Sequence, residues 1–597
     1  MRRLAFPFFQ LHSGSSPRTK SSLPTNVQTP LTYLVDTMQS SWWKEAVVYQ
    51  IYPYSFKDTT GTGIGDLNGI TSKLPYLRDL GVDVVWLSPI YASPMKDMGY
   101  DISDYYAIHP DMGTMKDWEI LVEEAHKTGL KVVMDLVVNH TSDQHEWFKE
   151  SKKGGDKKDW YIWKPAKGGK EPNNWGAIFG GSCWEWDENL KEYYLHVFDV
   201  SQPDLNWENP AVREAVWDVM KFWLDKGCDG FRMDVINCIS KEPGYPDVPV
   251  TDVAQEFQYG LLHRFNGPKV YDFLKEMNER VLKYFPDAFT VGETPGVATP
   301  EQAISYVKDG KPLRMIFHFE HMYMDIVPGK KCFFHRDWKL TELKNILGTF
   351  MEYMQAHNGW DSLYLENHDQ PRILGRWAND TTYRLQASKM LALFHATGRG
   401  TLFLYQGQEM AAANLKSWTY EELRDVEEIN FYDAEKALRP EGSDMSDVLS
   451  QIQVVGRDNS RTPMQWTGNE NAGFSTGKPW IKVNEDYKEW NVEKQLGDEN
   501  SALEFWRKLL KIRKQHPALV TGGFKMLDWE NEQVYAYTRT DESGEYLVVC
   551  SFCEEVVVWK SPSQGGEVLI SNYAADNDEG DSLKLRPYEG RLYYRKI

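Results

Sequence analysis

From residue 42 onward, short apolar runs alternate with longer stretches in which apolar residues recur every three or four positions. The short runs are rich in β-branched and aromatic residues, which is typical of strands, and the longer stretches have the period of amphipathic helices. The predicted strands span residues 46–56, 82–91, 131–140, 230–236, 288–293, 314–320, 361–369 and 400–409. The predicted helices span residues 70–81, 115–129, 209–227, 270–285, 339–356, 381–396 and 501–516. Eight strands, each followed by a helix or a long excursion, predict an α/β fold of the (β/α)8 TIM-barrel type.

Two segments depart from this alternation. Residues 141–208 are rich in Gly, Trp, Asn and Lys and are too long for a loop, so we expect an inserted subdomain B after strand 3. Near the end of the chain, short strands separated by turn residues predict a C-terminal antiparallel β-sandwich domain at 516–597. The catalytic barrel is then expected to comprise residues 38–140 and 209–515.

Residues 1–37 differ in composition from the rest of the chain. They contain four basic residues, many Ser, Thr and Pro, and no acid before Asp36. The apolar run LAFPFF is too short, and too broken by proline, for the core of a signal peptide. We expect a disordered leader or a start codon upstream of a functional start at Met38; a mitochondrial transit peptide is the alternative.

The composition and net charge of the chain limit the kinds of molecule that it is expected to bind. The 597-residue chain has a net charge of -20, which argues against nucleic acid, anionic membranes and phosphorylated substrates. It has no run of 18 apolar residues, so we expect no membrane helix. Six sparse cysteines fit a reducing compartment better than a disulfide framework. We expect a cytoplasmic monomer that acts on a small molecule.

Three predicted strands break directly from apolar residues into an acid. The acids are Asp234 in GFRMDVIN, Glu293 in FTVGETPG and Asp369 in YLENHDQPR. Burying an acid is costly unless it is paired or takes part in chemistry, and the functional groups of such barrels lie at the carboxyl ends of the strands. Arg232, two residues before Asp234, either neutralises it in a structural ion pair or keeps it ionised as a nucleophile. Three acids at three strand ends favour function over three separate salt bridges.

Two histidines stand beside these acids. His140 ends the third predicted strand, and His368 precedes Asp369. Each is either a satisfied structural histidine or a hydrogen-bond partner for sugar hydroxyls. The spacing of the histidines does not resemble that of a zinc site, so we expect no metal there.

Several motifs resemble those of glycoside hydrolase family 13, the α-amylase family, and most closely its oligo-1,6-glucosidase, isomaltase and maltase branch. The similarity extends over roughly residues 42–597. The motifs are DLVVNH (135–140), QPDLN (202–206), GFRMDVIN (230–237), VGET (291–294), ENHD (366–369) and SRTPMQW (460–466).

The resemblance implies a role for each matching position. It implies that Asp234 is the nucleophile, Glu293 the acid and base, and Asp369 the residue that binds the 2- and 3-hydroxyls and stabilises the transition state. It places His140, Arg232 and His368 around the glucose that is cleaved, and Tyr100 beneath that glucose. It also implies that Asp97 and Arg457 close the end of the pocket, which favours removal of one glucose at a time.

Val235 follows the expected nucleophile. In the resembling branch, isomaltase-like enzymes carry Val at this position and maltase-like enzymes carry Thr, so Val235 implies a preference for α-1,6 linkages. The alternative is an ordinary strand residue, since β-branched residues are common in strands. A methyl-for-hydroxyl difference changes discrimination by only about 1–3 kcal/mol.

The calcium loop of this branch is degenerate in the chain. The usual pattern D-x-N-x-D-G-x-G-D reads here as a loop with acids at its two ends and threonines between them, at Asp58, Thr60, Thr62 and Asp66. Calcium requires about 6–8 oxygen ligands, and its affinity depends on their charge. We therefore expect weak or no calcium binding and no cofactor.

The function expected from these features is that of a retaining, exo-acting α-glucosidase that releases glucose from small oligosaccharides with α-1,6 linkages. A maltase or sucrase type of α-1,4-glucosidase and a transglucosidase are the alternatives. Trehalose-phosphate hydrolysis is disfavoured because no Arg/Lys cluster suits a phosphate. A non-catalytic, transporter-associated member of the family is disfavoured by the three retained acids and the absence of an apolar span.

Overall fold

The computed structural model describes residues 41–310, 312–327, 332–562, 566–574 and 582–597. All of them belong to one compact unit. Among these residues, no helix combines the length and the apolar character needed to cross a bilayer.

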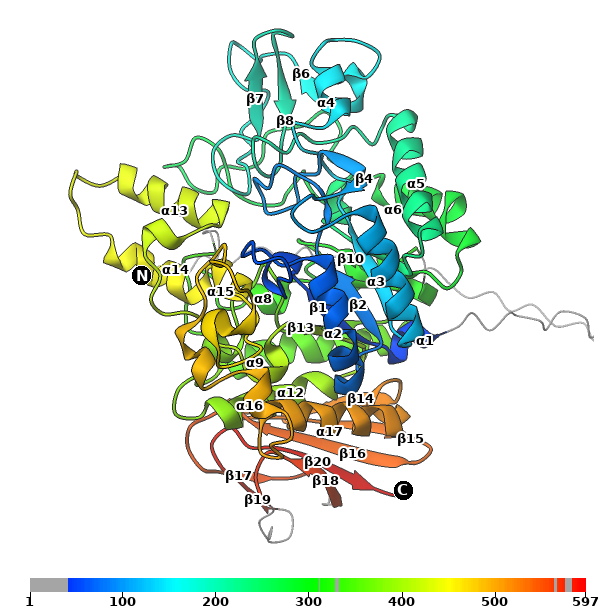
Figure 1. The fold of residues 1–597 in the computed structure, drawn as a ribbon, viewed down its shortest axis with the longest axis vertical. Coiled ribbons are helices and arrows are strands. Elements are labelled where there is room, and N and C mark those ends of the chain that lie inside the picture. Colours follow the sequence, from blue (N-terminus) through cyan, green and yellow to red (C-terminus); the bar gives the residue numbers. More distant parts are fainter. Residues whose placement is uncertain (1–40, 311, 328–331, 563–565, 575–581) are drawn as a thin grey trace, which may run out of the picture. The chain divides into compact units, whose positions relative to one another are not determined.

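The centre of this unit is an eight-stranded parallel sheet that curves into a barrel (Figure 1). Along the sheet the strands follow the order β11-β10-β9-β5-β2-β1-β13-β12, and β12 lies against β11, so the sheet is nearly closed. Its strands are β1 Val47–Ile51, β2 Val84–Leu87, β5 Lys131–Leu136, β9 Gly230–Met233, β10 Phe289–Glu293, β11 Met315–Phe317, β12 Ser362–Leu363 and β13 Thr401–Tyr405. This confirms the predicted barrel.

Helices surround the barrel, and their ends follow the local sequence signals. Asp66 caps α2 (Leu67–Leu80) by accepting a hydrogen bond from the Gly69 N–H, and Gly81 ends the helix in the left-handed conformation. Asn209 caps α5 (Pro210–Asp225), which has a proline at its first position. The other main barrel helices are α3 Met115–Lys127, α6 Val270–Arg280, α7 Pro300–Val307, α10 Thr349–Ala356, α12 Arg384–Ala396 and α17 Ala502–Gln515.

Several predicted elements are too long or incomplete. The strand predicted at 361–369 is regular only over Ser362–Leu363, and the one at 230–236 ends at Met233. The helix predicted at 339–356 is α9 (Leu340–Leu343), a π-helical turn and α10. The predictions did not include α7, nor α13 (Val426–Ala437), α14 (Ser446–Val455) and α15 (Asp458–Arg461), which follow β13. Apolar runs continue past the strand ends because the cavity above the barrel is also lined by buried side chains.

The segment between β5 and α5 forms its own small layer above the barrel (Figure 1). Its antiparallel sheet has the order β6-β8-β7, with β6 Trp163–Lys164, β7 Trp184–Asp187 and β8 Glu192–Leu195. Trp175, Trp184 and Val197 form a core that also includes Val235 and Phe265. The insert therefore packs onto the chain that directly follows β9.

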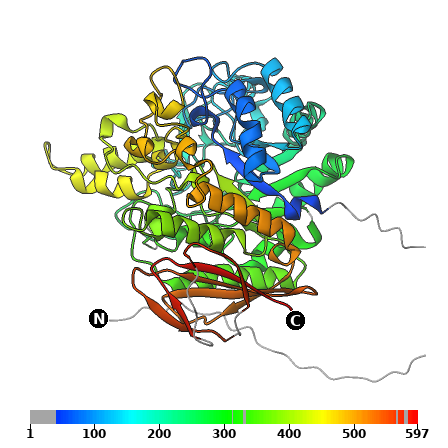
Figure 2. The ribbon, with the colours of Figure 1, turned by 60° about the horizontal axis from the view of Figure 1, so that its bottom comes forward.

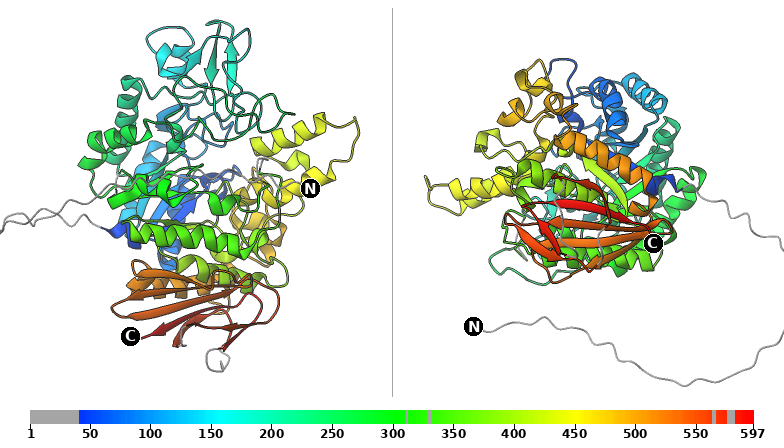
Figure 3. Two further views of the ribbon diagram at one scale, coloured as in Figure 1. Left: turned by 180° about the vertical axis from the view of Figure 1, so that it is seen from behind. Right: turned by 90° about the horizontal axis from the view of Figure 1, so that it is seen from below.

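The C-terminal strands form antiparallel sheets at the opposite end of the unit (Figures 2 and 3). Five strands follow the order β14-β15-β16-β20-β18, and β17 (Val557–Lys560) pairs with β19 (Ser582–Leu585). The five are β14 Gly523–Leu527, β15 Val534–Asp541, β16 Gly544–Ser551, β18 Glu567–Ser571 and β20 Gly590–Arg595. Helix α12 contacts β16 and β20, which joins this layer to the barrel. The predicted domain boundaries at 140/141, 208/209 and 515/516 remain our proposal.

Candidate active site

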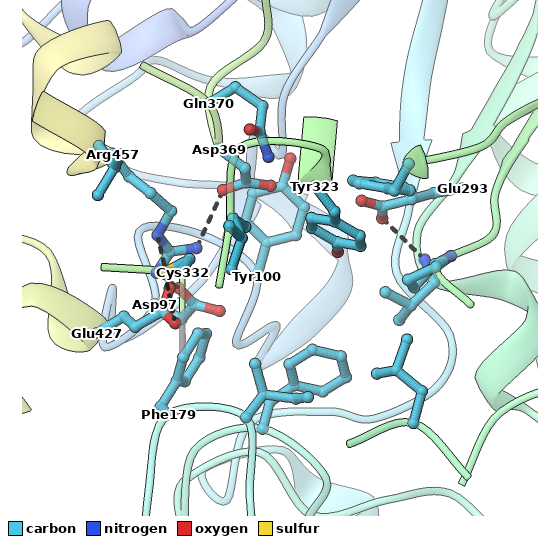
Figure 4. Close-up of a pocket in the computed structure, with 18 of the residues that line it drawn as sticks. Asp97, Tyr100, Phe179, Glu293, Tyr323, Cys332, Asp369, Gln370, Glu427 and Arg457 are labelled. Carbon is cyan, nitrogen blue, oxygen red and sulfur yellow. Dashed lines mark hydrogen bonds and ion pairs between the residues drawn. The ribbon is translucent and has the colours of Figure 1, made fainter. Parts of the chain in front are cut away.

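A cavity of about 180 Å³ opens at the carboxyl ends of the barrel strands, beneath the insert. The structure brings to it eight of the ten residues expected from the sequence. They are Asp97, Tyr100, His140, Asp234, Val235, Glu293, Asp369 and Arg457. The other two, Arg232 and His368, are buried directly behind this lining. Figure 4 shows Glu293 on the opposite side of the cavity from Asp97 and Arg457.

The Arg232 guanidinium is the centre of the acid side of the cavity. Its Nη1 lies 2.7 Å from both Asp135 Oδ1 and Asp234 Oδ1, and its Nη2 lies 2.5 Å from Glu293 Oε2. Arg232 is 1% exposed, so these contacts are shielded from water. Asp234 and Glu293 therefore lie side by side on one guanidinium fork, at the edge of one cavity.

These three carboxyl groups share one cation, so ionising all of them leaves an excess of two negative charges. Burial raises the pKa of Asp234 well above its usual range, with Arg232 opposing the rise and Glu293 adding to it. Burial also raises the pKa of Asp135 to about 6, against the effect of Arg232. The raised pKa values of Asp234 and Asp135 favour retention of at least one proton within this group at neutral pH.

Val235 is not a regular strand residue, because β9 ends two positions earlier. Its backbone is left-handed, with φ 32° and ψ 43°, a conformation that β-branched residues rarely adopt. In this conformation the Val235 N–H donates a 3.0 Å hydrogen bond to Glu293 Oε2. Its side chain lines the cavity and packs in the core of the insert. Val235 therefore connects the two acids, because it directly follows Asp234 in the chain and its N–H binds Glu293.

Asp369 has a contrasting environment. Its Oδ1 lies 3.0 Å from Nη1 of Arg457 (Figure 4). The same oxygen lies 3.0 Å from Nη2 of Arg461. His368 Nδ1 lies 2.8 Å from the Gln50 amide nitrogen; with the amide donating, the ring proton is on Nε2, 3.2 Å from Asp369 Oδ2. Burial raises the pKa of Asp369, but His368, Arg457 and Arg461 outweigh it and hold that pKa well below its usual range. Asp369 is therefore ionised at neutral pH.

The two histidines lie beside the cavity as neutral rings. Burial lowers the pKa of His140 to about 4 and that of His368 to about 3, against the nearby acids. His368 stacks on Tyr100 at 5.0 Å with an interplanar angle of 11°. His140 Nε2 lies 3.1 Å from the Tyr100 carbonyl oxygen and 3.2 Å from the Gln202 amide nitrogen. Both rings can hydrogen-bond to neighbours without adding charge.

Asp97 and Arg457 lie together at one end of the cavity. Their nearest oxygen and nitrogen are 3.7 Å apart, and the Gln202 amide donates to Asp97 Oδ2 at 3.0 Å. Burial raises the pKa of Asp97 to about 7, with Arg457 and Arg461 opposing the rise. Arg457 is also held by Asp425 at 2.6 Å. This end of the cavity carries polar groups suited to the hydroxyls of a terminal sugar.

Other residues at the site were not predicted from the sequence. Asp135, Gln202 and Arg461 belong to motifs that resemble the family, so their positions could have been inferred there. The outer part of the cavity is formed by residues of loops and of helices α8 (Glu320–Tyr323), α11 (Leu374–Trp377) and α13, and their sequence carries no recognisable signal. These include Phe179, Phe198, Tyr259, Tyr323, Cys332, Gln370, Arg376 and Glu427.

The degenerate calcium loop uses its own oxygens for internal hydrogen bonds. Asp58 accepts from the backbone N–H groups of Thr60, Gly61 and Gly63, and Asp66 accepts from Thr59 and caps α2. The Thr60 and Thr62 hydroxyls lie 3.2 Å apart. Two carboxylates already committed to the loop and the helix fit a calcium ion poorly. Over the described part of the chain, no cluster of three or more His, Cys, Asp or Glu side chains suits a metal.

A parallel barrel with paired carboxyl groups at the ends of neighbouring strands defines the class of barrel glycoside hydrolases. The chain belongs to the α-amylase family, glycoside hydrolase family 13, because a model of the α-amylase catalytic domain matches residues 50–522. This confirms the family indicated by the sequence motifs.

Individual relatives cover nearly the whole described unit. An oligo-1,6-glucosidase of Parageobacillus thermoglucosidasius is 50% identical over 566 residues, which are 93% of this chain and 99% of that protein. The structure of a trehalose-6-phosphate hydrolase from Bacillus licheniformis matches with a TM-score of 0.86 and 43% identity, covering 93% of this chain and 100% of that one. The structure of a trehalulose synthase from Pseudomonas mesoacidophila MX-45 matches with a TM-score of 0.86 and 38% identity, covering 93% and 99%.

Proposed function

We propose that the protein is a retaining, exo-acting α-glucosidase that removes glucose from the non-reducing ends of small α-1,6-linked oligosaccharides. The observation that carries this proposal is the pair Asp234 and Glu293, held on the two arms of the Arg232 guanidinium at the edge of one cavity. Retaining glycosidases use two carboxyl groups about 5–5.5 Å apart, one as nucleophile and one as acid and base.

In the first step, Asp234 attacks the anomeric carbon and Glu293 gives its proton to the glycosidic oxygen. The bond to the leaving sugar breaks, and a β-glucosyl ester of Asp234 forms. In the second step, water attacks the same carbon, gives its proton to Glu293 and releases glucose with the α configuration. Arg232 stabilises the carboxylate that Asp234 becomes when the ester is cleaved.

Asp369 is proposed to accept hydrogen bonds from the 2- and 3-hydroxyls of the glucose. Its ionised state suits this role, because hydrogen bonds to a charged acceptor strengthen as positive charge develops on the sugar ring. His140 and His368 are neutral rings that hold the groups around the same glucose, and the Tyr100 ring lies beneath it. Asp97 and Arg457 bind the hydroxyls at its non-reducing end, which supports removal of single glucose units.

The substrate class is proposed from the cavity lining and from the relatives. The oligo-1,6-glucosidase named above supports α-1,6 linkages, as does Val235. The described lining has two cationic side chains, and both are committed to acids: Arg376 to Asp325 at 2.5 Å, and Arg457 to Asp425 at 2.6 Å. This favours an uncharged sugar over a sugar phosphate, although a trehalose-6-phosphate hydrolase has a similar structure.

Water and a second sugar compete for the glucosyl-enzyme, so transglucosylation is the second candidate. A trehalulose synthase with a similar structure favours this candidate. Product analysis at high isomaltose concentration separates the two: free glucose alone indicates hydrolysis, and longer saccharides indicate transfer.

The roles of the two acids are tested by chemical rescue. Glu293→Gln should lose activity on isomaltose but recover turnover of an activated aryl α-glucoside when azide is added, giving the α-glucosyl azide. Asp234→Ala with azide should give the β-glucosyl azide, because attack on the substrate then inverts the centre. Glu301→Gln, at an exposed acid on α7, is the matched control and should behave as the parent enzyme. Full activity of either variant on isomaltose contradicts the assignment.

We further propose a monomer in the cytoplasm. The six cysteines are free in the structure, which supports a reducing compartment. Light scattering on the purified protein and fractionation of cells test these two statements, and enrichment with membranes would instead support a transporter-associated role.

A further inference from the structure

Two acids without cationic partners are buried behind the arginines that hold Asp369. Glu428 lies on α13, and Asp458 is the first residue of α15; both are 0% exposed. Neither forms an ion pair with a Lys or Arg side chain of the described chain. Burying a charge without a partner costs several kcal/mol, so at least one of the two is expected to be neutral.

Hydrogen bonds to the backbone hold each of these carboxyl groups, and one of them joins Glu428 to Asp458. Glu428 Oε1 accepts the Asp458 N–H at 2.8 Å, and Asp458 Oδ2 accepts the N–H groups of Arg424 and Asp425, at 2.6 and 3.2 Å. The remaining oxygens, Glu428 Oε2 and Asp458 Oδ1, are both buried and without a hydrogen-bond partner. Two neighbouring acceptors without donors can be satisfied by one proton between them.

The pair lies at the junction that positions the arginines. Asp425 caps α13 through its Oδ1, and its Oδ2 holds Arg457 at 2.6 Å and Arg461 at 2.9 Å. These two guanidinium groups are the ones that hold Asp369. The start of α13 and the start of α15 are therefore tied together by Glu428, Asp458 and Asp425, directly behind the cavity.

We propose that Glu428 and Asp458 share one proton, and that this proton positions Arg457 and Arg461 on Asp369. Glu428 is the positioning residue that carries the proton, and Asp458 Oδ1 accepts it. When the proton is lost, the two carboxylates repel, the junction of α13 and α15 loosens, and binding of the terminal glucose weakens. The only bond that breaks is the O–H bond of the Glu428 carboxyl group, and its proton passes to the solvent.

Other titrating and charged groups face the pair. Burial is the main reason that the pKa of Glu428 is raised. Asp458 and Asp425 raise it further, and Arg461 opposes the rise. Burial and then Asp425 raise the pKa of Asp458 to about 6, against Arg461. The centroid of the Tyr52 ring lies 5.6 Å from the guanidinium carbon of Arg461. Arg457, Asp97, Glu427 and Asp369 are further charged groups of this junction.

The direction in which stability changes with pH follows from the raised pKa values of Glu428 and Asp458. The native protein holds the proton more tightly than the unfolded chain, so the contribution of the pair to stability is fully present at acidic pH. It is lost as the pH rises through the native pKa values. A glutamine at position 428 keeps the Oε1 acceptor and offers a permanent N–H donor to Asp458, so it should remove this loss.

The experiment compares KM for isomaltose and the melting temperature of the parent enzyme and Glu428→Gln from about pH 5 to about pH 9. The expected result is near equality at acidic pH and a difference that grows with pH, with KM several-fold lower and the melting temperature higher in the variant. A difference that stays constant with pH, or no difference, overturns the proposal. Asp97 titrates in both proteins, so its effect cancels in the comparison.

Three further measurements isolate the cause. Glu435→Gln, at a partly exposed acid on the same helix, should follow the parent enzyme at every pH. Glu428→Met removes the charge without offering a donor; its KM should change with pH as that of Glu428→Gln does, while its melting temperature is lower throughout. The infrared band of a protonated carboxyl group should be stronger in the parent enzyme than in Glu428→Gln at neutral pH. The melting temperatures do not depend on the proposed role of Asp369, so they test the proton even if the proposed function fails.

Discussion

Replacing Val235 by Thr should move the linkage preference from α-1,6 towards α-1,4. Thr has nearly the same shape and is also β-branched, so it adds no new strain to the left-handed backbone at this position. The change is one methyl for one hydroxyl on a side chain that is 6% exposed and lines the cavity. On the side of the insert, Val235 packs against apolar residues that include Phe265 and Val248.

The magnitude follows from the hydroxyl and from the two substrates. A buried hydroxyl without a partner costs about 1–3 kcal/mol. An α-1,6 bond places a methylene group beside the scissile oxygen, which suits the methyl of Val. An α-1,4 bond places a ring carbon there, flanked by a 3-hydroxyl that can satisfy the new group. The ratio of kcat/KM for isomaltose to that for maltose should therefore fall by roughly 10–200-fold.

The assay is glucose release from each disaccharide by one enzyme preparation, so that the ratio does not depend on the active fraction. Val235→Ala is the control, because it removes methyl groups without adding a hydroxyl and should lower both rates without favouring maltose. An unchanged ratio in Val235→Thr, or an equal change in both variants, would refute the reasoning. A parent enzyme that already prefers maltose would show that Val235 does not set the linkage.

Three other predictions concern the charges. Arg232→Met leaves three buried carboxyl groups without their cation, so kcat/KM should fall by at least ~100-fold in steady-state assays; a smaller loss would show that Arg232 is dispensable. Burial lowers the pKa of His140 to about 4, so the protein gains stability from the neutral ring above about pH 6.5. As the pH falls towards 4, the free energy of unfolding should decrease by ~3 kcal/mol. Urea unfolding of His140→Asn should show a shallower acid limb, and parallel limbs would contradict this. Chelator or added calcium should leave the melting temperature unchanged, whereas a clear shift would show that the loop at Asp58 binds the ion.

The sequence predicted the barrel and the place of its acids because both depend on local patterns. An apolar strand that breaks into an acid is visible in the residues around Asp234 and Glu293, and parallel strands in a barrel necessarily bring such ends together. The sequence also predicted Arg232 beside Asp234, because alternate residues of a strand point to the same side. The contact of Arg232 with Glu293 depends on the register between β9 and β10, which residue spacing does not reveal.

Other features depend on contacts between distant segments. The left-handed turn at Val235 is strained, and intrinsic preference would have extended the strand through it, so tertiary packing overrides propensity there. The strand predicted near Asp369 ends at Leu363, and Asp369 contacts Arg457 and Arg461, which lie about 90 residues further along, so residue spacing does not reveal these contacts. Helix α13 carries polar residues on most faces, so its pattern gave no sign of the buried Glu428.

The two arginine centres of the site create opposite electrostatic conditions a short distance apart. Around Arg232 the carboxyl groups outnumber the cation, and burial raises the pKa values of Asp234 and Asp135, which favours retention of a proton within this group. Around Asp369 two guanidinium groups and a histidine ring face one carboxylate, which therefore stays ionised. An enzyme that both protonates a leaving oxygen and stabilises a cationic sugar needs both conditions at once. A single shared cluster of charges would average the two conditions. One cavity supplies both because Arg232 lies on β9, whereas Arg457 and Arg461 come from the start and the end of α15.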